Sequence, residues 1–242
     1  MSAKPTILFV PGAWHSDFHA RPVLPCFEKL GYNVKILLLA NLGDHTASDP
    51  RPGTDDSVEK ILKAMHEEAK AGREFVLLGH SAGGLVSGMA TNKFLASASA
   101  EEKSKLKRII FLASFINTSR HIVSHWNHMD FEKGLSWPLR PEEVFYNDMS
   151  IEESKPYCEA LQPMTLTGRP DEIDPLWHQV PRTFIVALKD QALLPWKQRE
   201  EAEEQGFDLY ELDAGHCPFI SQPKNFASVV DGIIEGKADG KA

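Results

Sequence analysis

The 242-residue sequence has little cysteine and no long apolar run, and both shortages limit what the protein can be. Its three cysteines, Cys26, Cys158 and Cys217, are odd in number and are not spaced like metal ligands. They indicate neither a disulfide framework nor a zinc site. The first apolar run, residues 6–10, is far too short for a transmembrane span or the core of a signal peptide. We therefore expect a cytoplasmic protein without a membrane anchor.

The sequence also lacks an excess of positive charge. It has 26 Lys and Arg against 34 Asp and Glu, a formal net charge of −8, and no stretch rich in Lys or Arg. This balance disfavours nucleic acid and anionic membranes as partners. Hydrophobic residues make up 42% and charged residues 25% of the chain, which excludes disordered, collagenous and coiled-coil classes. A small-molecule substrate is the expected partner, and the sequence specifies no oligomeric state.

Short apolar runs alternate with helical patterns along most of the chain. The helical patterns include residues 58–69, with apolar side chains three or four positions apart, and residues 225–234. Nearly continuous apolar strands are typical of a parallel sheet that is buried on both faces. We therefore predict a single α/β domain over residues 1–242, with a mostly parallel sheet and helices on both faces. The predicted strands are residues 6–10, 34–39, 75–78, 108–113, 183–188 and 207–212.

Residues 115–181 interrupt this alternation. They contain no run that resembles a strand, but they hold many aromatic side chains and helical candidates such as residues 150–161. So long a connection is unusual in a compact domain unless it has a purpose. The aromatic content argues against a disordered insertion. We expect a helical cap, inserted before the penultimate strand, over the carboxyl edge of the sheet.

The strand predicted at residues 75–78 runs directly into Gly79-His80-Ser81-Ala82-Gly83-Gly84, and a helical pattern follows. This is the G-x-S-x-G nucleophile elbow in the strand, turn and helix context that it requires. The turn projects the Ser81 hydroxyl, and the small glycines leave room for a substrate. The helix N-terminus that follows favours a developing negative charge. Ser81 is therefore the candidate nucleophile.

A serine needs a base to remove its proton, and the base should come late in the chain. Of the ten histidines, only His216 follows the last predicted strand, in Ala214-Gly215-His216-Cys217-Pro218. We predict that His216 is the base. His121, His125, His128 and His178 fall in or near the cap, where they could line the pocket, but a structural or solvated role is expected for each.

The acid partner of the histidine should follow the strand before the last one. That strand, residues 183–188, leads into Lys189-Asp190-Gln191, so Asp190 is the predicted acid. Asp213 is a rival because it is close to His216 in sequence, but it would have to fold back from the end of a strand. The strand that ends at Ala113 is followed by no carboxylate in residues 114–119, which excludes that alternative position.

An oxyanion hole needs two backbone N–H donors beside the nucleophile. The first is Ala82, the residue after Ser81. The second should come from the loop after the first strand, Pro11-Gly12-Ala13-Trp14, where proline cannot donate and glycine permits a tight bend. Ala13 is the favoured donor and Trp14 is the alternative.

With these motifs in place, the chain resembles the compact α/β-hydrolases that include plant methyl esterases, hydroxynitrile lyases and microbial carboxylesterases. The resemblance covers nearly the whole chain. It departs from the family at Pro11, where members often have histidine. The matching segments are residues 12–15, 79–84, 111–113, Phe145-Tyr146-Asn147-Asp148, 161–163, Asp190 with 194–195, and Gly215-His216.

The resemblance implies a cofactor-free, metal-free serine hydrolase that cleaves a carboxylic ester or lactone through an acyl-enzyme. Three alternatives remain: a hydroxynitrile lyase, a biosynthetic enzyme that uses the same triad for C–C cleavage, cyclisation or isomerisation, and a ligand-binding receptor. The lyase activity in the family uses a lysine after the histidine, and Cys217 stands there instead.

The aromatic cap suggests a largely apolar substrate. Its tryptophans are candidates for the pocket wall, although each could instead anchor the cap in the core. The predicted pocket residues are Trp126, Trp137 and Trp177 in the cap, with Trp14 and Phe219 outside it.

Overall fold

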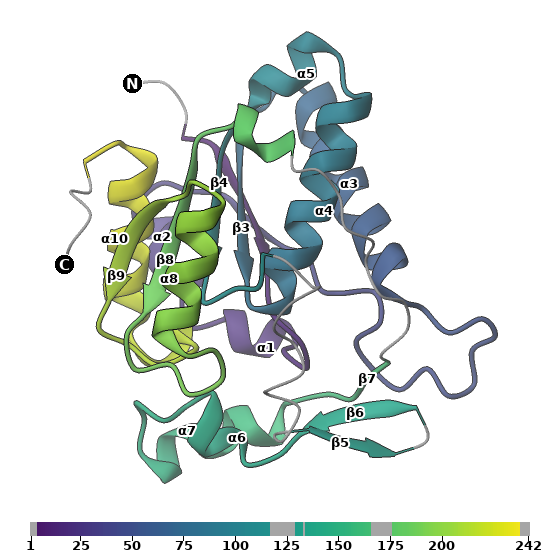
Figure 1. Cartoon of the computed structure of the whole chain (residues 1–242), viewed down its shortest axis with the longest axis vertical. Helices are drawn as coiled ribbons and strands as arrows, with labels where there is room; N and C mark the ends of the chain where they lie inside the picture. Colours follow the sequence, from purple (N-terminus) through teal and green to yellow (C-terminus); the bar gives the residue numbers. More distant parts are fainter. Residues whose placement is uncertain (1–3, 117–128, 133, 166–175, 238–242) are drawn as a thin grey trace.

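The computed structural model describes residues 4–116, 129–132, 134–165 and 176–237 (Figure 1). Its centre is a six-stranded sheet in the order β2-β1-β3-β4-β8-β9, and every neighbouring pair in it is parallel. The predicted parallel α/β sheet is confirmed. Its strands are β1 (Thr6–Val10), β2 (Val34–Ile36), β3 (Phe75–His80), β4 (Leu106–Leu112), β8 (Arg182–Ala187) and β9 (Asp208–Leu212).

Helices lie on both faces of this sheet, with α3 (Thr54–Lys70) and α4 (Ala82–Ser97) on one side, and α2 (Leu24–Lys29) and α10 (Pro223–Ile234) on the other (Figure 1). β1 and β3 are buried along their whole lengths, as a sheet covered on both faces requires. The remaining helices are α1 (Asp17–Ala20), α5 (Ala100–Lys105), α8 (Pro195–Glu204) and α9 (Pro218–Ser221).

The cap contains helices, as expected, but the prediction that residues 115–181 hold no strand is wrong. Three strands there, β5 (Met129–Glu132), β6 (Leu135–Pro138) and β7 (Met164–Thr165), form an antiparallel sheet. They are too short for alternation to show in the sequence, and β7 pairs with β6 across a long loop. The other cap elements are α6 (Pro141–Val144), α7 (Ile151–Glu159) and the 3-10 helix η3 (Leu176–Gln179).

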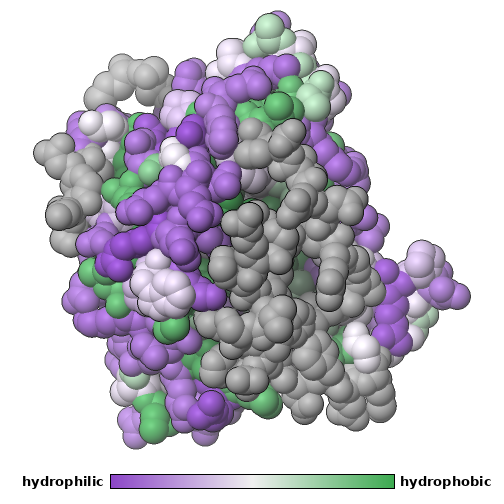
Figure 2. Space-filling view, in the orientation of Figure 1, coloured by the Kyte–Doolittle hydropathy of each residue, from purple (hydrophilic) through white to green (hydrophobic). Residues whose placement is uncertain are grey.

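Among the residues coloured in Figure 2, most of this face is hydrophilic, and the hydrophobic residues form small, separate patches. Among the described residues, four large hydrophobic side chains are exposed: Trp137, Leu139 and Ile151 in the cap, and Trp196 in α8. No helix within the described ranges is both long enough and apolar enough to cross a bilayer.

The first turn of α4 touches the ends of two strands, and its glycines make this contact possible. A Cβ atom on Gly83 would lie 2.3 Å from the Val10 carbonyl oxygen and 2.4 Å from that of Pro11. A Cβ atom on Gly84 would lie 1.9 Å from the Ser114 Oγ atom. The backbone of the helix therefore rests directly on the segments that follow β1 and β4, which fixes the turn between β3 and α4.

Gly83→Ala is expected to lower the free energy of unfolding by about 3 kcal/mol or more, because backbone oxygens cannot move aside singly. The control is Gly88→Ala in the same helix, where the new Cβ atom would lie 3.0 Å from the Trp177 ring, a side chain that can shift. Its gain in helix propensity of roughly 1 kcal/mol offsets that contact, so we expect near wild-type stability. Urea unfolding measures both, and equal stabilities of the two variants would contradict this account.

Candidate active site

Ser81 occupies the strained turn between β3 and α4. Its backbone has φ 51° and ψ −127°, a conformation that non-glycine residues rarely adopt. Three hydrogen bonds hold it there. The Ser81 amide donates to the Leu112 carbonyl at 3.0 Å, and the Ser81 carbonyl accepts from the Gly84 amide and the Ser114 hydroxyl, each at 2.9 Å. The half-buried Ser81 side chain is therefore presented from a fixed backbone.

His216 and Asp190 lie in contact and are almost completely buried. The His216 Nδ1 atom is 2.8 Å from Asp190 Oδ2. The same carboxylate accepts from the amides of Ala192 at 2.7 Å and Leu193 at 2.9 Å, and from Gln198 Nε2 at 2.9 Å. Because a carboxylate can only accept here, Nδ1 of His216 carries the proton and Nε2 is free to act as a base.

Asp213 lies in a different environment from Asp190. Its carboxylate forms an ion pair with Lys189 Nζ at 2.8 Å, and its side chain is 68% exposed. The structure thus brings Asp190, rather than Asp213, to His216.

The loop after β1 lies directly against Ser81. A Cβ atom on Gly12 would be 2.8 Å from the Ser81 Cβ atom, so only glycine allows this approach. Trp14 has a positive φ of 64°, and its carbonyl accepts from the Gln162 amide of the cap at 3.0 Å. Within the described part of the chain, the amides of Ala13 and Ala82 donate to no protein acceptor. The two predicted oxyanion donors are therefore available to a ligand.

Sequence reasoning missed a group of buried histidines beside the site. His80 accepts from the Gly12 amide at 3.3 Å through Nδ1 and donates through Nε2 to the His216 carbonyl at 3.0 Å. His15 donates through Nδ1 to the Ala13 carbonyl at 2.6 Å, which leaves its Nε2 to accept from the Tyr146 hydroxyl at 3.2 Å. These contacts define one neutral tautomer for each ring.

Burial keeps these histidines neutral, because it lowers the pKa of His15 and of His80 well below the ordinary value of 6.5. Burial also lowers the pKa of His19. Cys217 lies 3.4 Å from His15 Nε2, and burial raises the pKa of its thiol well above the ordinary value. Among the described residues, no group of three or more His, Cys, Asp or Glu side chains is arranged to hold a metal ion.

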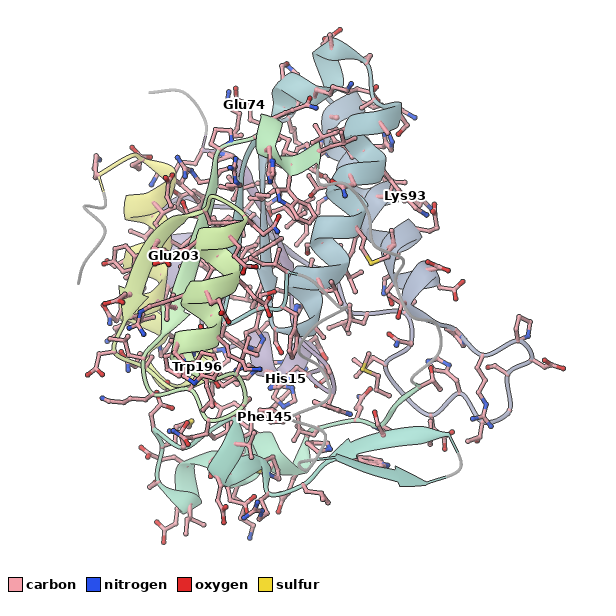
Figure 3. The ribbon with its side chains drawn as sticks, in the orientation of Figure 1. His15, Glu74, Lys93, Phe145, Trp196 and Glu203 are labelled. Carbon is pink, nitrogen blue, oxygen red and sulfur yellow. The ribbon has the colours of Figure 1, made fainter. Side chains whose placement is uncertain are left out.

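Two aromatic rings from different segments meet beside His216. Trp14 stacks on Phe145 with centroids 5.7 Å apart, and Phe145 lies 5.4 Å from the His216 ring. The Trp14 indole donates to the Ser136 carbonyl at 3.0 Å. Figure 3 shows His15 and Phe145 between the end of the sheet and the cap. Phe145 was not predicted as a site residue, although its segment was among those that carry the family resemblance.

The other predicted pocket residues have different surroundings. Phe219 is fully buried and packs on Phe9 and His80 in the core, and Trp177 is buried against Gly88 of α4. Trp137 is 40% exposed and follows the buried Ser136 on β6, so it points away from Trp14. Four residues named from the sequence lie outside the described ones: the pocket candidate Trp126 and the cap histidines His121, His125 and His128.

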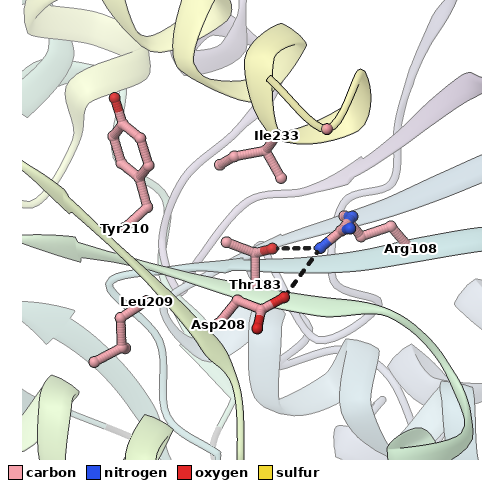
Figure 4. A pocket seen from close by; sticks show the side chains of 7 residues that line it. Arg108, Thr183, Asp208, Leu209, Tyr210 and Ile233 are labelled. Carbon is pink, nitrogen blue, oxygen red and sulfur yellow. Dashed lines mark hydrogen bonds and ion pairs between the residues drawn. The ribbon is translucent and has the colours of Figure 1, made fainter. Parts of the chain in front are cut away.

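A surface hollow of about 330 Å³ lies at the opposite end of the sheet (Figure 4). Arg108, Thr183 and Asp208 line it at the amino ends of β4, β8 and β9. There, Arg108 donates to the Thr183 hydroxyl at 2.7 Å and pairs with Asp208 at 3.6 Å. Since Ser81 follows the carboxyl end of β3, this hollow is not part of the candidate site.

The fold is that of an α/β-hydrolase, and comparison with known proteins agrees. The model of the alpha/beta hydrolase family matches residues 7–229, so the chain belongs to this family of hydrolases. Methylesterase 1 of Arabidopsis thaliana is 24% identical in an alignment 269 positions long, which covers 96% of this chain and 98% of that protein. The chain is therefore an α/β-hydrolase that resembles plant methylesterases.

Two further similarities show the range of the family. Alpha-hydroxynitrile lyase of Arabidopsis thaliana is 29% identical over 141 residues, which cover 56% of this chain and 50% of that protein. The crystal structure of polyneuridine aldehyde esterase matches with a TM-score of 0.75 at 17% identity, over 95% of this chain and 99% of that chain. At this identity the match shows the fold.

The buried neutral histidines predict a stability that falls in acid. The unfolded chain takes up protons near pH 6.5, whereas native His15 and His80 do so only well below it. The free energy of unfolding should therefore decrease as the pH falls below about 6.5, by up to roughly 1.4 kcal/mol per pH unit for each such histidine. Urea unfolding between pH 5 and 7 measures this slope.

His80→Asn removes one titrating group. It should therefore reduce the slope of the unfolding free energy against pH by up to roughly 1.4 kcal/mol per pH unit, which corresponds to one proton. His178→Asn is the matched control, since that exposed side chain meets water in both states. An unchanged slope in His80→Asn would contradict the neutral, buried state of His80.

Proposed function

We propose that the protein is a cofactor-independent serine hydrolase that cleaves a carboxylic ester or lactone of a small, largely apolar molecule through an acyl-enzyme. The observation that carries this proposal is the buried hydrogen bond of 2.8 Å between His216 Nδ1 and Asp190. It leaves a base at the sheet edge where the strained turn presents Ser81. The His216 carbonyl accepts a hydrogen bond from the His80 side chain, and His80 directly precedes Ser81. This contact supports the proximity of the proposed base and nucleophile.

In the proposed reaction, His216 Nε2 removes the Ser81 proton while the Ser81 oxygen attacks the acyl carbon. The amides of Ala13 and Ala82 donate to the oxyanion, and Asp190 stabilises the imidazolium. His216 then gives its proton to the leaving alcohol. A water molecule, deprotonated by His216, releases the acid and restores Ser81.

The apolar substrate class rests on Trp14 and Phe145, whose stacked rings adjoin His216. An ester as the scissile group is supported by the similarity to Methylesterase 1 of Arabidopsis thaliana and to polyneuridine aldehyde esterase. Cys217 argues against the lyase alternative. That activity uses a cationic lysine at this position, whereas the buried Cys217 thiol stays uncharged because burial raises its pKa.

Ser81→Ala should retain the fold and lose about three or more orders of magnitude in kcat toward a simple ester, because only binding and oxyanion stabilisation remain. A fluorophosphonate probe should add its mass to the peptide that contains Ser81. Labelling of another residue in the folded protein, or full activity of the variant, would overturn the proposal.

Asp190→Asn should lower kcat/KM much more than Asp213→Asn does, because the amide favours the wrong tautomer of His216. The Asp213 variant removes only an exposed ion pair. Ester hydrolysis by both variants, beside their melting curves, tests the acid role. The reverse order at equal stability would transfer that role to Asp213.

A further inference from the structure

Two adjacent cap residues, Asn147 and Asp148, reach the two loops that carry the proposed acid and base. Asn147 Nδ2 donates to the Lys189 carbonyl at 2.9 Å. Asp148 Oδ2 accepts from the Gly215 amide at 2.8 Å. Lys189 directly precedes Asp190, and Gly215 directly precedes His216. The cap therefore holds the residue before each partner of the buried pair.

These contacts complete a closed ring of residues that adjoins the Asp190–His216 pair. The two loops are also joined directly, because the Lys189 amide donates to the Ala214 carbonyl at 2.8 Å. The ring thus runs through Lys189, the cap residues, Gly215 and Ala214. Since it includes both loops, a shift of one loop relative to the other would break at least one of its hydrogen bonds.

Asn147 and Asp148 also pack closely against the loop that carries His216. A Cβ atom on Gly215 would lie 2.7 Å from both Asn147 Oδ1 and Asp148 Oδ1. Both oxygens are buried, and neither has a hydrogen-bond partner among the described residues. The two cap side chains therefore occupy the space that a side chain at position 215 would need.

We propose that Asn147 and Asp148 are positioning residues that set the geometry of Asp190 relative to His216. The inference rests on the proposed function. Neither residue needs to touch the substrate, because each acts through the loop that it holds. A misplacement of about 1 Å in a catalytic arrangement can lower the rate by about 100-fold, so two hydrogen bonds to the adjoining backbone are sufficient to matter.

The test compares Asp148→Ala and Asn147→Asp in two backgrounds, the wild type and Asp190→Asn. The measurements are kcat and KM for a simple ester and the rate at which a fluorophosphonate labels Ser81. In the wild type we expect kcat and labelling to fall by about 10- to 100-fold, with KM within about threefold. In the Asp190→Asn background the further loss of kcat should be below about threefold, because the pairing of Asp190 with His216 that the cap residues maintain is already impaired.

Three variants sharpen this test. Asp148→Asn keeps an acceptor for the Gly215 amide and should recover most of kcat. Ser221→Ala removes the other hydrogen bond of Asp148, at 2.8 Å, and should change kcat by less than about threefold. Gly215→Ala, which displaces both cap oxygens without leaving a cavity, should reproduce the kcat loss and replaces Asp148→Ala if that variant does not fold.

Two outcomes would overturn the inference while leaving the proposed function standing. One is an unchanged kcat in the folded variants, with Ser81 still labelled at the wild-type rate. The other is an equal loss in both backgrounds, which would indicate a general structural effect. Failure of the wild-type protein to label at Ser81 would instead overturn the proposed function, and this inference with it.

Discussion

The active-site end of this protein depends on one close contact, the approach of the first turn of α4 to the segments after β1 and β4. Ser81 can hold its unfavourable φ of 51° only because its surroundings determine its backbone. Gly83 lets the helix touch the Val10 carbonyl, and Gly12 lets the next loop lie against Ser81. Because helix and loop meet at the same turn, Gly12 of the loop and Ala82 of the helix both adjoin Ser81. A larger side chain at either glycine would separate the groups on which the proposed chemistry relies.

The buried polar groups behind this turn connect the cap to the sheet. His15 accepts from Tyr146 of the cap, and His19 donates to the Tyr157 carbonyl at 3.0 Å, also in the cap. Since burial lowers the pKa of both histidines, these hydrogen bonds join neutral groups with fixed donor and acceptor roles. The described part of the cap is therefore hydrogen-bonded to the segment after β1 and to the loops of Asp190 and His216, which ties its position to that of the candidate site.

The sequence was most informative where the signal is local. Consecutive residues around Ser81 encode a strand, a tight glycine turn and a helix. The order of the triad residues along the chain in this fold then selects His216 and Asp190. No local sequence pattern predicts structure that depends on partners distant in the chain. The strands β5 to β7 are too short to show a period, and β7 is defined by pairing with β6. Likewise, aromatic character alone could not separate Trp177, which fills the core beside Gly88, from Phe145, which adjoins His216. Only packing distinguishes the two.

The same packing places the proposed apolar wall directly against the proposed catalytic groups. Trp14 belongs through its backbone to the loop after β1, which carries the proposed oxyanion donor Ala13, while its indole donates to Ser136 of the cap and stacks on Phe145. Phe145 in turn lies against His216 and directly precedes Tyr146, the partner of His15. A change in the apolar wall at Trp14 or Phe145 therefore reaches the oxyanion donors or the base without an intervening layer.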